Sequence, residues 1–219
     1  MKKILYLVLL FSIVFLIYYK NIDKTTNYLV IGDYLSYGIN NNNKVENSFS
    51  DRINEYLSRN KKIDYKKYVR KDDYRVVDLY NDIINDKKIT IKNKKYTIKQ
   101  LLIKADIVIL SIGMNDMYYQ KNITDKYKYV DELLEDLDKL FELVRKNCKE
   151  EIYILNYYNV INNENVVNYS NRKLSSLADK YKLKVIDISN LNKYLTNNIY
   201  PTNAGYNYIY KKVKQVLQK

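Results

Sequence analysis

Short apolar runs that stop at a glycine constrain the fold of this chain more than any other feature. The run from Tyr28 to Ile31 is followed by Gly32, and the run from Asp106 to Ile112 by Gly113. Apolar runs of this length that end at a turn residue are typical of buried strands. The intervals between such runs carry helical spacing, most clearly from Asp125 to Asn147. Strands that alternate with helices predict a parallel sheet covered by helices on both faces.

The same patterns give the order of the expected elements. We predict strands over residues 28–31, 63–69, 106–112, 151–155 and 184–188. We predict helices over residues 48–59, 76–84, 125–147, 164–181 and 203–217. Ile89–Ile91 and Tyr96–Ile98 flank Lys92–Lys95, which predicts a small hairpin. In a sheet of this kind, functional sites lie at the carboxyl ends of the strands.

The chain has no histidine among its 219 residues, and this excludes several kinds of active site. A Ser-His-Asp or Cys-His arrangement cannot form within it. Zinc sites that need imidazole are excluded as well. The single cysteine, Cys148, can neither build a thiolate cage nor form an internal disulfide. We therefore expect no metal site and no cofactor.

The formal charge of +13 comes from 38 Lys and Arg against 25 Asp and Glu. Such an excess is common in proteins that bind nucleic acids or anionic membranes. Here, however, Lys greatly outnumbers Arg, and Asn, Ile and Tyr are abundant, as AT-rich codons of a low-GC bacterium would produce. Basic and acidic residues are also interspersed. We therefore expect no nucleic-acid partner, although the charge can help adhesion to anionic lipid or wall polymer.

The N-terminus has the layout of a membrane signal. Lys2 and Lys3 precede an apolar run from Ile4 to Tyr19, which is closed by Lys20. Because no small-residue cleavage site follows, we expect an uncleaved anchor, with secretion after cleavage as the alternative. The expected organisation is an anchor helix over residues 1–20, a linker over 21–26 and a domain over 27–219. The basic N-terminus predicts a single-pass membrane protein with its domain outside the cell.

Three short segments carry all four glycines and the candidate site residues. Gly32 to Gly38 reads Gly-Asp-Tyr-Leu-Ser-Tyr-Gly, and Gly113 to Asp116 reads Gly-Met-Asn-Asp. Tyr200 to Tyr206 reads Tyr-Pro-Thr-Asn-Ala-Gly-Tyr and contains the only proline, Pro201. Glycine in a chain that otherwise avoids it indicates a positive φ or a close backbone approach.

With these segments, the chain from Asn27 to Lys219 resembles the SGNH, or GDSL, hydrolase family of esterases and acyl hydrolases. The resemblance implies a three-layer α/β/α sandwich with a parallel, flavodoxin-like sheet of about five strands. It also implies where catalysis resides in the family. A Gly-Asp-Ser-Leu segment supplies the nucleophilic Ser, a Gly-x-Asn-Asp segment supplies an Asn to the oxyanion, and an Asp-x-x-His-Pro segment supplies acid and base.

Most of these family positions have changed here. Tyr34 stands at the nucleophile, Tyr200 at the His and Asn197 at the Asp, whereas Asn115 matches. The family's second segment contributes a Gly to the oxyanion hole, but the nearest counterpart, Val69–Asp73, contains none. A phenol with a pKa near 10 is a poor nucleophile and a poor general base at pH 7. We therefore expect a pseudoenzyme.

Two alternatives keep a weak or atypical esterase, or an acyltransferase, open. Ser36 lies two residues past the nucleophile position and is a candidate replacement. Tyr34 could instead be activated by a nearby Lys or by a carboxylate, for which Asp33 and Asp116 are candidates. The structural alternative for both aspartates is turn and cap hydrogen bonding. Asn115, in turn, has either an oxyanion-binding or a purely structural role.

In place of catalysis, we expect the strand-end loops to bind a ligand. Tyrosines that include Tyr34, Tyr157, Tyr158 and Tyr200 fall at the ends of predicted strands, where they would line a groove for a glycan, a lipid or a protein. The alternative is that clustering means little, because the chain has 26 tyrosines. The sequence thus predicts a non-catalytic envelope module, with activity on envelope glycans or lipids as the second hypothesis.

Overall fold

A five-stranded parallel sheet forms the centre of the domain. The computed structural model describes residues 6, 10–15, 25–39, 44–45, 47–71, 73–119, 122–196 and 199–218. The strand order is β2-β1-β5-β6-β7, which is the flavodoxin-like arrangement. The strands are β1 (Thr26–Gly32), β2 (Ile63–Val69), β5 (Ile107–Ser111), β6 (Glu151–Leu155) and β7 (Lys184–Ile186). The predicted α/β class with a parallel sheet is confirmed.

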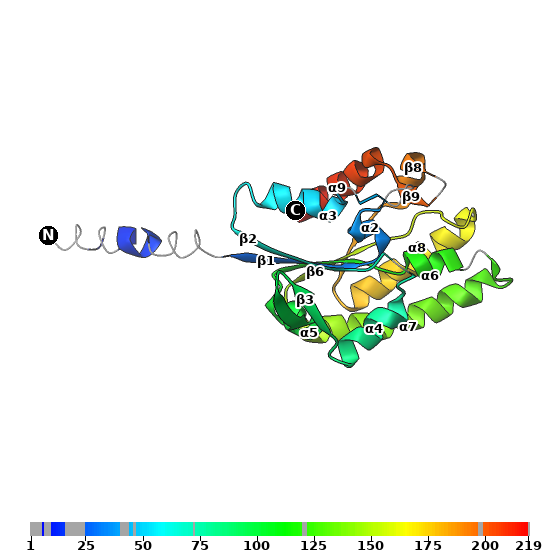
Figure 1. Ribbon diagram of the computed structural model, residues 1–219, viewed down its shortest axis with the longest axis horizontal. Coiled ribbons are helices and arrows are strands. Elements are labelled where there is room, and N and C mark those ends of the chain that lie inside the picture. The colour runs from blue at the N-terminus through cyan, green and yellow to red at the C-terminus, as the bar shows by residue number, and fades with distance from the viewer. Residues whose placement is uncertain are drawn as a thin grey trace.

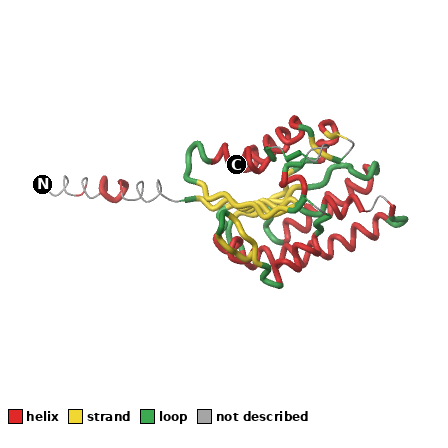
Figure 2. Tube along the Cα trace, viewed as in Figure 1, coloured by secondary structure: helices red, strands yellow, loops and turns green. Residues whose placement is uncertain are grey.

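Helices cover both faces of this sheet, as Figure 1 and Figure 2 show. On one face lie α3 (Phe49–Leu57) and α9 (Asn203–Leu217), which contact each other. On the other face α7 (Lys126–Asn147) packs against α4 (Val76–Ile84), α5 (Ile98–Lys104) and α8 (Glu164–Lys180). At the carboxyl ends of the strands lie α2 (Tyr34–Tyr37), α6 (Met114–Tyr119) and the 3-10 helix η2 (Ser189–Tyr194).

Helix α7 shows why the apolar spacing predicts the layers. Its buried residues recur every three or four positions and form one stripe: Val130, Leu133, Leu137, Leu140, Phe141 and Val144. This stripe faces the sheet, in which all but the first residue of β5 is buried. Burial of such a continuous apolar face is the main source of stability in an α/β domain.

Two short pairs of strands lie outside the main sheet. The first joins β3 (Lys88–Ile91) and β4 (Lys94–Thr97), and the second joins β8 (Leu195–Thr196) and β9 (Tyr200–Pro201). The hairpin predicted at Lys92–Lys95 therefore turns at Lys92 and Asn93 alone, both with positive φ. Ile98, predicted as strand, begins α5, because Thr97 and Gln100 form a capping box there.

Part of the N-terminal apolar run lies among the described residues. Tyr6 and residues 10–15 are helical and exposed, and the exposed fraction of Phe11 is 72%. Among the described residues, no helix combines the length and the apolar character needed to cross a bilayer. The rest of the predicted anchor and most of the predicted linker lie outside the described residues.

Candidate functional site

The first candidate segment turns directly from β1 into helix α2. Asp33 is the N-cap of α2, and its Oδ1 accepts a hydrogen bond from the backbone N–H of Leu35 at 3.2 Å. Gly38 closes this single turn with a φ of 93°. An Asp at an N-cap satisfies a backbone donor that would otherwise lack a partner. The structural role predicted as the alternative for Asp33 is therefore present.

The phenol of Tyr34 points into the protein instead of lining an open mouth. Only 4% of Tyr34 is exposed. Its hydroxyl lies 2.7 Å from that of Tyr158, which in turn donates to the backbone oxygen of Ile199 at 2.5 Å. The Tyr200 ring packs edge-on against the Tyr34 ring, with 5.5 Å between centroids. The positions of the family's nucleophile and histidine therefore do meet, but as a packed aromatic pair.

Burial also changes the acid–base properties of this tyrosine cluster. Burial, followed by the neighbouring Tyr158 and Asp33, raises the pKa of Tyr34 well above its ordinary value. Burial likewise raises the pKa of Tyr158. Because a phenolate is the nucleophilic form, Tyr34 is a weaker nucleophile here than a tyrosine in water.

Asp33 has a second, unusual feature beside its capping role. Its side chain is fully buried, and Ser111 at the end of β5 donates to its Oδ1 at 3.2 Å. No described residue bonds its Oδ2. Burial raises the pKa of Asp33 to about 7, although the bonds from Leu35 and Ser111 favour the charged form. Below about pH 7 the folded protein therefore keeps a proton on Asp33, and the unpartnered Oδ2 is the oxygen that can carry it.

The Gly-Met-Asn-Asp segment is tied to the chain that follows β2. The Asn115 side-chain nitrogen donates to the backbone oxygen of Tyr74 at 2.9 Å. Asp116 accepts from the backbone N–H of Val76, the first residue of α4, at 3.2 Å. Burial raises the pKa of Asp116 to about 6. Both side chains thus tie α6 to the chain between β2 and α4, which is the structural alternative predicted for each.

Gly113, which follows β5, lies against the side chain of Tyr157, which follows β6. Gly113 has a φ of +96°, and a Cβ at this position would lie 2.3 Å from the Tyr157 hydroxyl. Tyr157 follows β6 and is 1% exposed. Burial raises the pKa of its phenol, and the nearby carboxylates of Asp116 and Asp33 raise it further. Its hydroxyl has no hydrogen-bond partner among the described residues. Tyr157, which was predicted to line a groove, is therefore part of the core, and only a glycine at position 113 leaves room for its hydroxyl.

Tyr157→Phe is expected to stabilise the domain by about 1 kcal/mol, because it removes a buried hydroxyl that forms no hydrogen bond. Urea denaturation followed by circular dichroism measures this change. Tyr158→Phe is the matched control, since Tyr158 does use its hydroxyl, and we expect it to destabilise by about 1 kcal/mol. Equal effects of the two variants would contradict the assignment of Tyr157.

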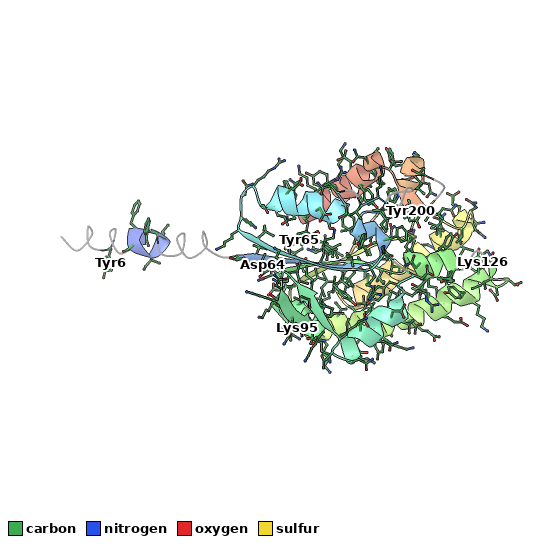
Figure 3. The ribbon with its side chains drawn as sticks, viewed as in Figure 1. Tyr6, Asp64, Tyr65, Lys95, Lys126 and Tyr200 are labelled. Carbon is green, nitrogen blue, oxygen red and sulfur yellow. The ribbon has the colours of Figure 1, made fainter. Side chains whose placement is uncertain are left out.

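The remaining predicted positions are spread over two elements. Ser36 lies in α2, is fully buried, and its Oγ has no partner among the described residues. Tyr200 is half-buried in β9, and Figure 3 labels this residue at the edge where the strands end. Asn197, predicted at the family's Asp position, lies outside the described residues. The structure thus places Tyr34 with Tyr200, and Asn115 with the Tyr74 backbone.

Among the described residues three cavities stand out, and Tyr34, Asn115 and Tyr200 line none of these three. The first, about 400 Å³, lies between Arg70 and Lys87. The second, about 210 Å³, lies beneath Leu29 beside Tyr96, and the third, about 300 Å³, lies between Asn168 and Asn190. In the part of the chain that the structure describes, no group of three or more Cys, Asp or Glu side chains is placed to hold a metal ion.

Two contacting residues were not among the predicted site residues: Ser111 and Tyr74. Ser111 had a signal, since it is the one hydroxyl residue within the apolar run of β5. Tyr158 was predicted at the same strand end as its neighbour Tyr157, and its hydroxyl contacts Tyr34 and Ile199. Tyr74 contributes a backbone oxygen, for which no side-chain pattern exists.

Comparison with known proteins identifies the family of the chain and finds solved structures with the same fold. The sequence profile of GDSL-like lipases/acylhydrolases matches residues 28–213. No curated protein matches the chain in sequence. Among solved structures, the chain resembles a lipase from a goat rumen metagenome, with a TM-score of 0.68 and 16% identity. That match covers 87% of this chain and 96% of the lipase.

Two further solved structures are similar to the chain. An acetylxylan esterase from Geobacillus stearothermophilus has a TM-score of 0.67 and 15% identity, over 89% of this chain and 94% of the esterase. A lipase/acylhydrolase from Enterococcus faecalis has a TM-score of 0.65 and 14% identity, over 88% and 95% of the two chains. At such identities the likeness shows the shared fold alone.

Proposed function

The chain belongs to the GDSL-like lipase/acylhydrolase family, and we propose that it has kept the family's fold without its catalysis. The observation that supports this most directly is the buried phenol of Tyr34, which stands where the family has its nucleophile. Its hydroxyl is bonded to Tyr158, and its ring is packed against Tyr200. An acyl group would have to displace this packing before it reached any hydroxyl at that position.

The acid–base side of the chemistry supports the same conclusion. The family's base is a histidine, and this chain contains none. Asp33 and Asp116 have raised pKa values, but both accept backbone hydrogen bonds that hold the loops. Without nucleophile and base, the rate that an oxyanion hole alone provides is at most about 10³–10⁴ over water. The amide of Asn115 is itself bonded to Tyr74.

In the proposed role, the protein is an accessory or binding module of the cell envelope. The apolar run from Ile4 to Tyr19, with Lys2 and Lys3 before it, anchors the chain in the membrane and leaves the domain outside. The five exposed apolar side chains in the helical stretch 10–15 support this anchor, because such side chains in water would be unfavourable. An envelope glycan, lipid or protein is then bound outside the family's active-site position.

Hydrolysis of esters is the activity to test, because the similar structures are those of lipases and an acetylxylan esterase. The full chain, purified in detergent, is treated with a fluorophosphonate probe and a short-chain aryl ester, next to an active serine esterase. We expect no covalent label and no turnover above buffer. Labelling or turnover that Tyr34→Phe or Ser36→Ala abolishes would overturn the proposal in favour of an atypical esterase.

A further inference from the structure

One edge of the sheet carries an excess of lysines. In a parallel sheet all strands begin at the same edge, which we call the basal edge; the strands end at the opposite, or upper, edge. Figure 3 labels Asp64 near the start of β2, toward the basal edge, and Tyr200 and Lys126 at the upper edge. The chain enters the sheet at the basal edge, since Thr26 begins β1 and its backbone N–H donates to the oxygen of Lys62.

The two edges differ in charge. Among the described residues, the three positions before each of the five strands include five lysines and two acidic residues: Lys61, Lys62, Lys104, Lys149 and Lys182, with Asp106 and Glu150. Among the same described residues, the three positions after each strand include two basic and two acidic residues: Arg70 and Lys71, with Asp33 and Asp187. The basal edge is therefore positive, and the upper edge is close to neutral.

The basal lysines are available to an outside partner. Lys61, Lys62, Lys104, Lys149 and Lys182 are exposed, and none forms an ion pair with a described residue. The nearby acids are partly occupied: Asp106 accepts from the backbone and the side chain of Asn27, and Glu151 pairs with Lys184. Helix C-termini at this edge account for some basic residues, such as Lys104 in the last turn of α5. Lys149 and Lys182 likewise directly follow the C-caps of α7 and α8, Cys148 and Tyr181. Helix ends do not account for Lys61 and Lys62, which lie in the loop before β2.

We infer that the basal edge binds the anionic phospholipid headgroups of the bilayer that holds the N-terminal helix. This inference rests on the proposed anchor. Six residues, from Lys20 to Thr25, separate the apolar run from β1, and they span at most about 20 Å. Tethered this closely, the lysines reach the negative surface potential that anionic headgroups of the outer leaflet create, which extends about 10 Å at 0.1 M salt. Each lysine near such a surface favours the bound state about fivefold.

The consequence is a fixed orientation of the domain. The basal edge lies on the membrane, and the upper edge, with Tyr34, Tyr200 and the cavity between Asn168 and Asn190, faces away from it. The domain then presents its strand-end loops to the envelope, at a distance from the lipid.

The test uses the full chain in nanodiscs, with a fluorophore on a single added cysteine. Asn60→Cys, in the loop before β2, reports on the basal edge, and Asn190→Cys, in η2, reports on the upper edge. Both residues are exposed and can therefore be labelled. Cys148 stays in place, since a buried thiol with a raised pKa labels slowly. The discs are phosphatidylcholine alone or with about 30% phosphatidylglycerol. A spin label on the lipid headgroup quenches the fluorophore when the two are close.

We expect quenching at position 60 to be at least about threefold stronger in anionic than in neutral discs, with no such difference at position 190. About 0.5 M NaCl should remove the difference. The variant with Lys62, Lys104, Lys149 and Lys182 changed to Gln should also lose it. A charge-matched variant with Lys71, Lys128, Lys173 and Lys193 changed to Gln should keep it, since these exposed lysines lie away from the basal edge.

Two results would overturn the inference in different ways. A chain that does not elute with the disc overturns the anchor and this inference with it. A chain that elutes with the disc but is quenched equally in both lipids, or a loss of the difference in both lysine variants, overturns the basal edge alone and leaves the anchor standing.

Discussion

Tyr34→Ser is expected to lower the free energy of unfolding by about 3–5 kcal/mol, the usual cost of removing a buried aromatic ring. The variant restores the residue type that the family has as nucleophile, but it leaves a cavity where the phenol contacts Tyr200 and Tyr158. It should show no esterase activity, because the chain still lacks a histidine. Urea denaturation, followed by circular dichroism, measures the change in stability.

Tyr34→Phe is the matched control for this variant. It keeps the ring and removes only the hydrogen bond to Tyr158, whose hydroxyl still donates to Ile199. We expect it to cost about 1 kcal/mol. A cost below about 1 kcal/mol for Tyr34→Ser would mean that the ring contributes no packing, and the site would then have to be open. The two variants thus separate the role of the ring from that of the hydroxyl.

The layers of the fold were predictable because they depend on patterns along the chain. The apolar run at 106–112 contains β5, and the helix predicted over 76–84 has the observed bounds of α4. The stripe of α7 has a period that no strand shares. Helix α5 was missed because its seven residues are too few for a clear period. Its capping box, Thr97 with Gln100, was the available signal.

The candidate site was predictable in its location but not in its contacts. A parallel sheet brings the segments after β1 and β5 to the same edge, so that Asp33 and Ser111 lie within reach of each other. The sequence does not fix the direction of a side chain within a loop. Whether Tyr34 lines a groove or fills the core depends on its rotamer and on Tyr158, which is 124 residues away along the chain. For the same reason Tyr157, predicted at a groove, lies under Gly113.

Asp33→Asn is expected to stabilise the domain in a pH-dependent way, and the sign follows from the raised pKa. In the unfolded chain Asp33 ionises near pH 3.9, whereas the folded protein keeps the proton up to about pH 7. Between these values the folded state binds more protons than the unfolded state, so stability falls as the pH rises. Three pH units correspond to about 4 kcal/mol, which is fully lost above pH 7.

Asparagine reproduces the neutral form of Asp33. Its oxygen can accept from Leu35 and Ser111 as Oδ1 does, and its NH₂ replaces a protonated Oδ2. The variant should therefore match the wild type near pH 4 and exceed it by up to about 4 kcal/mol at pH 8. Urea denaturation at several pH values measures the difference between the two proteins. Taking this difference cancels the self-repulsion of a chain with a charge of +13, which both proteins share.

Asp187→Asn is the control of opposite sign. Asp187 follows β7, and hydrogen bonds from Ser189 and Asn156 hold its pKa below the ordinary value, although partial burial acts the other way. Its ionised form stabilises the folded state above the unfolded pKa, and this contribution is lost as the pH falls through the lower folded pKa. Asp187→Asn should therefore destabilise the domain at pH 8. A constant difference between Asp33→Asn and the wild type from pH 5 to pH 8 would mean that Asp33 is ionised throughout. The unpartnered Oδ2 would then carry a charge, and a buried carboxylate of that kind would need a cation or a donor that the described residues do not supply.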